Sequence, residues 1–482
     1  MKNYVMTILA VCMFATGALG QAVTKPPAGE AKESLAVTVY NGGYGVVREV
    51  RNMDVKDGLA RFTDVAAAID ATTVHFKSLT DPAAKLLEQN YQFDLVSADK
   101  LLRKYIDKAI EVVVKDAKGY SGTLMSFDGA QIVLKEEGGN LIMVQRADNV
   151  RDIRFKSLPE GLLTKPTLVW KIDTAKPGNQ LAEVTYQTNG IGWHAEYVMV
   201  LGDNDTAADL SGWVSVENNS GKTYNDAHMK FIAGDVRKIV ETLGRPTGAM
   251  AKAAGGAGGG GMEEKAFFEY HMYTLPRPST VADREVKQLE MFDPVGGIKV
   301  VKRFMYCPMQ GWRWYGGRYT DRSYGVTSDK KVQVFVEFRN SKENGLGIPL
   351  PAGKVRCYKQ DPDDKALEFI GEEKIDHTPK DEDLSLQIGN AFDIVGERKQ
   401  TNFKIEIARY WMQESFEITI RNHKKEDAIV RIKEPMYRWN EWKITDTNTK
   451  DYKKLDAFNV AWDVPVKADG TATVTYTVDY TW

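Results

Sequence analysis

The residues in this chain best suited to chemistry are histidines placed beside carboxylates. The segment 372–386, EEKIDHTPKDEDLSL, has His377 directly after Asp376 and before a run of acidic residues. A histidine and carboxylates meeting at one point could supply the acid and base of a hydrolase, or the ligands of a metal ion. No helical periodicity surrounds the segment, and Pro379 and Asp381 are typical of extended and turn structure. We therefore interpret it as a structural turn between two strands.

A second candidate is a zinc-type site made of His194, Glu196 and His228. Strand alternation in GIGWHAEYVMVL (190–201) places His194 and Glu196 on one face, and in DAHMKFIAG (226–234) it places His228 on the polar face. If the two strands were neighbours, these three side chains could converge on one metal ion. Exposed polar pairs across strands are the competing interpretation. No motif in the chain predicts an organic cofactor.

The clearest binding signal is the segment QGWRWYGGRYTDRSYG (310–325), in which aromatic residues alternate with arginines. Aromatic rings offer stacking faces and guanidinium groups bind carboxylates, as carbohydrate or peptide recognition requires. Two further segments, YHMYTLPRP (270–278) and MYRWNEWK (436–443), could add rings to the same surface. In the competing interpretation, these side chains only cover the ends of sandwiches. The predicted binding residues are Trp312, Arg313, Trp314, Tyr315, Arg318 and Tyr319.

Other candidate groups are weaker. The acidic loops 201–209 and 360–366 lack the glycine and the final glutamate of an EF-hand. Cys307 and Cys357 could form a disulfide in an oxidising compartment. Both also fit strand patterns as small apolar residues, and the sequence leaves the two interpretations open.

The N-terminus predicts export. Lys2, an apolar run and the small residues that end at Gly20 have the pattern of a secretory signal peptide over residues 1–20. No later segment is apolar enough to span a membrane. The formal net charge is −2, which gives no electrostatic footprint for nucleic acid. We expect a periplasmic or extracellular protein that does not bind nucleic acid.

The elements that must position these residues are mostly strands. Period-2 alternation, as in TATVTYTVDYTW (471–482), recurs along the chain and is typical of sheets with one buried face. The fold class predicted is mainly β: multidomain antiparallel immunoglobulin-like β-sandwiches, a small SH3/Sm-like barrel insert and one short helix. The helix is SADKLLRKYI (97–106), with Ser97 as its N-cap.

The predicted organisation has four parts after the signal peptide. They are an N-terminal β region (21–85), the helix and barrel insert (86–158), a β-sandwich (159–297) and a C-terminal β-sandwich region (298–482). A glycine-rich loop at 241–262 lies inside the third part. The predicted core of the insert is Val112, Val114, Leu124, Ile132, Leu134, Ile142, Val144, Val150 and Ile153.

Several segments together resemble a bacterial exported family, domain of unknown function 4139, which is loosely linked to mucoidy-inhibitor proteins. They include AVTVYNGGYGVVREVR (36–51), GWVSVENNSGKTYNDAHMKFIAGDV (212–236) and GIPLPAGKVRCYK (347–359). The resemblance implies a β-rich protein of the cell envelope with no assigned reaction. The function predicted is a non-enzymatic binding or scaffolding module whose partner is an envelope protein or a polysaccharide. The alternative is a metal-dependent hydrolase acting on envelope polymers. The sequence does not predict the oligomeric state.

Overall fold

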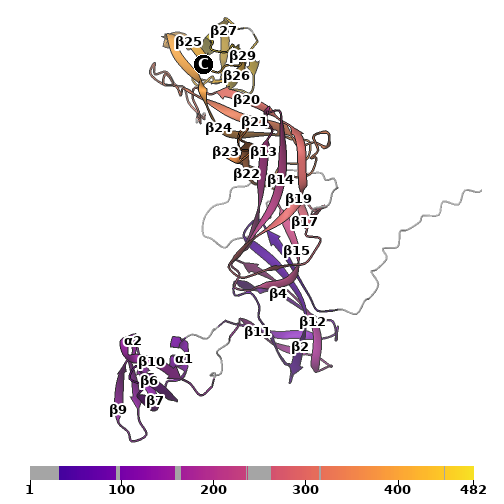
Figure 1. Ribbon diagram of the computed structural model, residues 1–482, viewed down its shortest axis with the longest axis vertical. Helices are drawn as coiled ribbons and strands as arrows, with labels where there is room; N and C mark the ends of the chain where they lie inside the picture. Colours follow the sequence, from indigo (N-terminus) through magenta and orange to yellow (C-terminus); the bar gives the residue numbers. More distant parts are fainter. Residues whose placement is uncertain are drawn as a thin grey trace, which may run out of the picture.

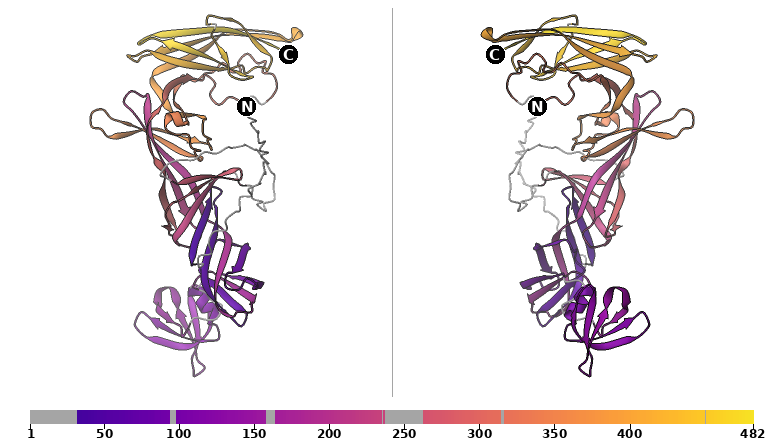
Figure 2. Two further views of the ribbon diagram at one scale, coloured as in Figure 1. Left: turned by 90° about the vertical axis from the view of Figure 1, so that its right-hand side faces the viewer. Right: turned by 90° about the vertical axis from the view of Figure 1, so that its left-hand side faces the viewer.

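The computed structural model describes residues 32–93, 98–157, 164–234, 236, 262–313, 316–449 and 451–482. The predicted signal peptide and all but the last residue of the predicted glycine-rich loop lie outside these residues. The chain is mainly β and elongated, with the insert at one end and the C-terminal sandwich at the other (Figures 1 and 2). Within the described ranges, no helix combines the length and apolar character needed to cross a membrane.

An eleven-stranded sheet forms the N-terminal half of the body. It has alternating buried and exposed side chains, as the period-2 pattern predicts. Its strands are β1 (Ser34–Tyr40), β2 (Tyr44–Lys56), β3 (Leu59–Thr63), β4 (Ile69–Ser78), β5 (Lys85–Gln92), β11 (Thr167–Asp173), β12 (Gly178–Asn189), β15 (Tyr224–Ala233), β16 (Glu263–Phe267), β17 (Tyr270–Thr274) and β18 (Ser279–Val281).

A five-stranded sheet shares its hydrophobic core with this sheet. Tyr197 and Val214 of the smaller sheet lie in one cluster with Val37 and Phe231 of the larger one, and all four are fully buried. The smaller sheet has the order β19-β14-β13-β22-β23. These strands are β13 (Ile191–Leu201), β14 (Ala207–Asn218), β19 (Glu285–Lys299), β22 (Gly353–Gln360) and β23 (Leu367–Ile375).

The insert is a separate small unit with its own core. Its sheet has the order β10-β6-β7-β8-β9 and is open, because β9 and β10 are its two edges. Six of the nine predicted core residues are buried in the insert's hydrophobic cluster, together with Leu102, Tyr105 and Ile110. The other three, Ile142, Val150 and Ile153, are partly buried and pack against this cluster. Ser97, the predicted N-cap, lies outside the described residues. The elements are α1 (Ala98–Lys104), β6 (Ala109–Val114), β7 (Gly119–Phe127), β8 (Gln131–Lys135), β9 (Leu141–Gln145), α2 (Arg146–Asn149) and β10 (Val150–Arg154).

The C-terminal sandwich is built from a nine-stranded sheet around a third core. Val474, Tyr476, Val478 and Tyr480 are buried on one face of its last strand, as the alternation predicts. The elements are β20 (Val301–Tyr306), β21 (Lys331–Arg339), η1 (Lys342–Asn344), β24 (Asp383–Glu406), η2 (Ile407–Arg409), β25 (Trp411–Asn422), β26 (Ala428–Pro435), β27 (Trp442–Thr447), β28 (Lys453–Lys454), β29 (Asn459–Val466) and β30 (Thr471–Thr481).

The sheets do not follow the predicted domain boundaries. β1 pairs in parallel with β15, and β2 pairs with β12, so strands from 21–85 and 159–297 belong to one sheet. β22, from 298–482, pairs in parallel with β13. Parallel partners must be far apart in sequence, and alternation along one strand does not identify its neighbour.

Two long strands connect the body to the C-terminal sandwich. Leu384 and Leu386 of β24 belong to the core of the body, whereas Ile394 of the same strand belongs to the C-terminal core. β21 behaves in the same way, with Phe338 in the first core and Val332 in the second. The two parts are therefore joined by two continuous strands that are hydrogen-bonded to each other.

Asp205 forms two ion pairs near this connection. It lies in the turn between β13 and β14, and its carboxylate binds Lys302 of β20 and Lys359 of β22. Burial alone would raise the pKa of Asp205, but the hydrogen bonds and charges of the two lysines outweigh it and hold the pKa below its ordinary value. The acidic loop 201–209 thus uses this carboxylate for ion pairing.

We expect Asp205→Asn to lower the free energy of unfolding at pH 7 by on the order of 1 kcal/mol, because the ion pairs are only partly shielded from solvent. A depressed pKa stabilises the folded state above the ordinary aspartate pKa, and this contribution disappears as the pH falls through the folded-state value. The difference from wild type should therefore shrink between pH 5 and pH 3 in urea denaturation. Asp203→Asn, at an exposed position in the same turn, is the control. An equal loss in both variants, or a loss independent of pH, would contradict the assignment.

Candidate binding surface

The segment with the strongest binding signal is a long connection between β20 and β21, and its described residues, 307–313 and 316–330, are called here the aromatic–arginine loop. The fully buried side chain of Arg438 holds its middle. Arg438 Nη1 donates to the carbonyl oxygens of Tyr319, at 3.0 Å, and of Asp321. In return, Tyr319 N donates to the carbonyl oxygen of Arg438 at 3.2 Å. One guanidinium group therefore fixes the backbone of the loop at several points.

A second buried arginine holds the C-terminal part of the loop. Arg398 of β24 donates from Nη1 to the carbonyl oxygen of Gly325 at 2.7 Å. Tyr306, at the end of β20, donates its hydroxyl hydrogen to the carbonyl oxygen of Asp329 at 2.8 Å. Burial raises the pKa of Tyr306 to about 12, so the hydroxyl stays a donor at neutral pH. The middle and the C-terminal part of the loop are thus attached to the core.

Each buried arginine has a buried carboxylate as its partner. Arg438 Nη2 lies 2.7 Å from Glu414 Oε1, and Arg398 Nη2 lies 2.6 Å from Glu434 Oε1, with all four side chains fully inaccessible. Glu414 also accepts hydrogen bonds from Gln400 and Tyr437, and Glu434 accepts one from Tyr476. Charges this deeply buried require such partners, since an unpaired one would be very costly.

The outer side of the loop presents arginine and aromatic side chains together. The guanidinium carbon of Arg318 lies 5.2 Å from the ring centre of Trp482 and 5.9 Å from that of Trp439, within the range of cation–π contacts. The rings of Tyr319 and Tyr324 stack in parallel, with centres 4.3 Å apart and an interplanar angle of 7°. All four of these aromatic side chains are partly exposed.

A small pocket lies at the N-terminal part of the loop. It has a volume of about 150 Å³ and is lined by Trp312, Gln310, Lys433 and Cys307, among others. Trp312 packs edge-on against Phe458, with ring centres 6.2 Å apart. Burial raises the pKa of the Cys307 thiol to about 11. A thiol that is protonated at neutral pH is a poor nucleophile, so this pocket does not present a reactive cysteine.

The structure places the predicted binding residues as follows. Trp312, Arg313, Arg318 and Tyr319 all lie on the aromatic–arginine loop, whereas Trp314 and Tyr315 lie outside the described residues. Segment 436–443 joins the same surface, as predicted. Segment 270–278 does not, because its residues 270–274 form β17 in the eleven-stranded sheet.

The sequence analysis missed the buried residues that fix the loop: Glu414, Glu434, Arg398 and Arg438. A signal for Glu414 was present in WMQESFEITIRN (411–422). Alternation there places Glu414 on the same face as Met412, Phe416 and Ile418, which are buried. A carboxylate at an apolar position of a strand predicts a buried cationic partner.

The predicted metal set His194, Glu196 and His228 is not assembled, which corrects the sequence prediction. β13, which carries His194 and Glu196, has β14 and β22 as its neighbours, and β15, which carries His228, pairs with β1, β17 and β18. His194 Nε2 lies 3.1 Å from Glu196 Oε1, and Glu196 forms its other ion pair with Arg356. In the described ranges, no group of three or more histidines, cysteines and carboxylates could hold a metal ion.

Segment 372–386 joins β23 to β24 as a structural turn, in agreement with the prediction. His377 Nδ1 accepts a hydrogen bond from the backbone N–H of Ala352 at 3.1 Å, and Nε2 lies 3.2 Å from the side-chain amide of Asn41. Thr378 forms a two-way backbone bridge with Leu350. The histidine thus fastens this turn to neighbouring loops.

Cys307 and Cys357 are both free, so the disulfide is absent.

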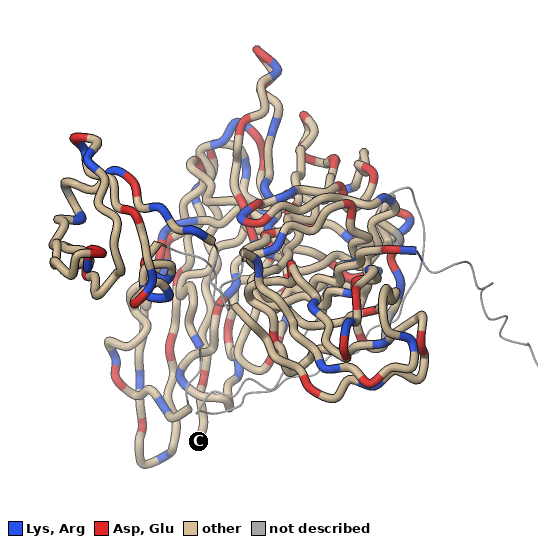
Figure 3. Tube along the Cα trace, turned by 90° about the horizontal axis from the view of Figure 1, so that it is seen from below, with Lys and Arg blue, Asp and Glu red and all other residues tan. Residues whose placement is uncertain are grey.

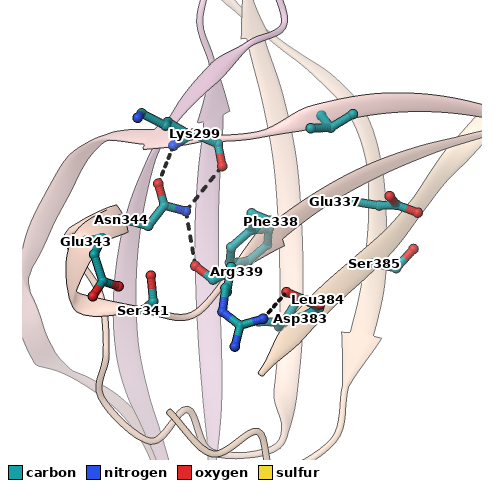
Figure 4. A pocket seen from close by; sticks show the side chains of 11 residues that line it. Lys299, Glu337, Phe338, Arg339, Ser341, Glu343, Asn344, Asp383, Leu384 and Ser385 are labelled. Atoms are coloured by element: carbon teal, nitrogen blue, oxygen red, sulfur yellow. Dashed lines mark hydrogen bonds and ion pairs between the residues drawn. The ribbon is translucent and has the colours of Figure 1, made fainter. Parts of the chain in front are cut away.

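A pocket of about 610 Å³ lies elsewhere, between η1 and the ends of β20, β21 and β24 (Figure 4). Its polar groups are largely paired with one another. Arg339 forms an ion pair with Asp383 at 3.2 Å, and the Asn344 amide bonds both the backbone N–H and the carbonyl of Lys299. This pocket is a polar recess at the junction of the body and the C-terminal sandwich.

Comparison with known proteins gives no further assignment. No family model matches the chain, and no curated protein matches it. The resemblance to the exported family therefore stays a prediction.

Proposed function

We propose that the protein is an exported, non-enzymatic binding or scaffolding module of the cell envelope, and that its ligand binds the aromatic–arginine loop. The observation that carries this proposal is the way the loop is held. Arg398 and Arg438 bond its backbone from inside the core, while Arg318 and the adjacent rings face outward. Backbone that is already held before binding loses little conformational entropy when a ligand binds.

Two further observations support binding over catalysis. The histidines and carboxylates of the predicted metal set lie on strands that are not neighbours, and the thiol beside the loop has a raised pKa. Tryptophan, tyrosine and arginine are the residues most enriched at binding hot spots. Export is supported by the signal-peptide pattern of residues 1–20.

The test is co-sedimentation of the purified mature protein with an envelope fraction. We expect Arg318→Ala/Trp482→Ala to weaken co-sedimentation by at least about tenfold, because hot-spot truncations cost 2 kcal/mol or more. Arg61→Ala is the matched control, since Arg61 is an exposed arginine on β3 of the eleven-stranded sheet. Thermal melts of all variants establish that they fold. Equal co-sedimentation of the double variant, the control and wild type would overturn the assignment of the surface.

A further inference from the structure

We infer that the free edge of the insert's sheet is an interface between two copies of this chain, which pair through β9 in antiparallel orientation. The interface lies on the insert and does not involve the aromatic–arginine loop, so it is independent of the proposed ligand surface. Three properties of β9 support it: its unpaired backbone groups, its exposed apolar side chains and its lack of charge.

β9 has a hydrogen-bonding neighbour on one side only. In the described part of the chain it pairs with β8 alone and forms one edge of the insert's sheet. The β8–β9 turn closes with a backbone hydrogen bond from Glu136 N to the carbonyl oxygen of Asn140 at 2.9 Å. Counted from this bond, the alternation of an antiparallel ladder directs the N–H and C=O groups of Leu141, Met143 and Gln145 towards the free edge. These backbone groups can pair with another strand.

The outer face of the same strand is apolar and exposed. Leu141 and Met143 are 65% and 66% exposed. Val133 of β8 lies opposite Met143 in the register and is half-buried. The third residue on this face of β9 is Gln145, which is polar but uncharged. In Figure 1, β9 lies on the side of the insert away from the eleven-stranded sheet. A strand added here would therefore bury apolar side chains as well as backbone groups.

β9 also lacks the charges that usually protect a sheet edge. Natural proteins keep other strands away from an edge with charged side chains, lysine above all. Charged residues are distributed along most of this chain (Figure 3), and the opposite edge of the insert's sheet, β10, carries Arg151, Asp152 and Arg154. Among the described edge strands longer than three residues, β9 alone has no aspartate, glutamate, lysine or arginine.

A second copy of β9 is complementary to this edge. A two-fold axis at Met143 places this residue opposite its own copy and Leu141 opposite Gln145 of the second copy. Each of the three residues then exchanges both of its free backbone hydrogen bonds with the residue opposite. A two-fold interface uses the same surface on both copies, so any charge on it would face a like charge. An uncharged strand avoids this repulsion, and the side chains of Val133 and Met143 from both copies form one apolar row.

The experiment measures the mass of the full mature protein by sedimentation velocity over about a hundredfold range of concentration, because assembly follows mass action. We expect wild type to form dimers. Met143→Lys and Met143→Glu should each weaken dimerisation at least about tenfold, because each places two like charges directly opposite one another. An equal mixture of the two variants should recover the dimer, since opposite charges then meet. Ile429→Lys, at an exposed position of the C-terminal sandwich, is the control and should dimerise like wild type.

Thermal melts establish that the variants fold, and the remaining outcomes would overturn the inference. Wild type that stays monomeric over the whole range would exclude the interface. Dimerisation unchanged in both Met143 variants, or weakened equally by Ile429→Lys, would place the contact elsewhere. Folded Met143 variants whose mixture stays monomeric would exclude pairing of β9 with itself and indicate another strand, such as β10, as its partner. None of these results affects the test of the proposed function, which depends on Arg318 and Trp482.

Discussion

Replacing Arg438 by methionine is expected to lower the free energy of unfolding of the C-terminal sandwich by about 3–5 kcal/mol, the usual cost of removing one partner of a buried ion pair. The substitution leaves the Glu414 carboxylate in the core with only Gln400 and Tyr437 as hydrogen-bond donors. It also removes the donor that holds the carbonyl oxygens of Tyr319 and Asp321. Urea denaturation followed by tryptophan fluorescence measures the loss, and trypsin should cleave the variant faster after Arg318 and Arg322.

Two further variants separate the buried pair from a general effect of losing an arginine. Arg421→Met removes an exposed ion pair with Glu397, at 3.0 Å, and should cost at most about 1 kcal/mol. Arg438→Met/Glu414→Leu removes both buried charges and should recover a large part of the lost stability, because no unpaired carboxylate remains. Equal losses in Arg438→Met and Arg421→Met would contradict the structural role of the buried pair. Unchanged trypsin cleavage would contradict the anchoring of the loop.

A second large effect is expected at Gly396 of β24. A Cβ atom at this position would lie 2.2 Å from Cε2 of Tyr306, whose ring is fully buried and whose hydroxyl is bonded to the carbonyl oxygen of Asp329. The ring cannot move away without breaking that bond. Gly396→Ala should therefore lower the free energy of unfolding by about 1–3 kcal/mol, as overpacking of a dense core usually does, and it should loosen the C-terminal end of the aromatic–arginine loop.

Gly389 offers a matched control on the same strand. A Cβ atom at position 389 meets nothing within 4 Å, so Gly389→Ala should change the stability by less than about 0.5 kcal/mol. Both variants are compared by urea denaturation under identical conditions. If Gly389→Ala lowers the free energy of unfolding as much as Gly396→Ala does, the lost stability comes from the strand backbone. Contact with Tyr306 would then not explain it.

Much of the fold could be predicted because the alternation of apolar and polar residues along a strand indicates which of its faces is buried. Alternation assigned the buried face of segment 471–482 and six of the nine predicted core residues of the insert. Pairing between strands could not be predicted in the same way. The register that places Ala36 opposite His228, and the parallel pairing of β13 with β22, depend on contacts far apart in sequence. The predicted metal set failed for this reason, since it required β13 and β15 to be neighbours.

The composition of the sequence indicated the candidate site, but it did not indicate the buried residues that hold the loop. The local richness in tryptophan, tyrosine and arginine identified the loop and segment 436–443. What the pattern did not indicate is that Arg438, within that segment, faces inward, whereas Trp439 beside it faces the surface. The sequence does not show whether an arginine is buried or exposed. That depends on whether the fold places a buried carboxylate beside it.

The sharing of β21 and β24 between two cores has a mechanical consequence. A hinge between the body and the C-terminal sandwich would have to bend two paired strands whose side chains are packed at both ends. A force applied to the C-terminal sandwich should therefore be transmitted directly to the body. The distance and the angle between the body and the C-terminal sandwich should therefore vary little.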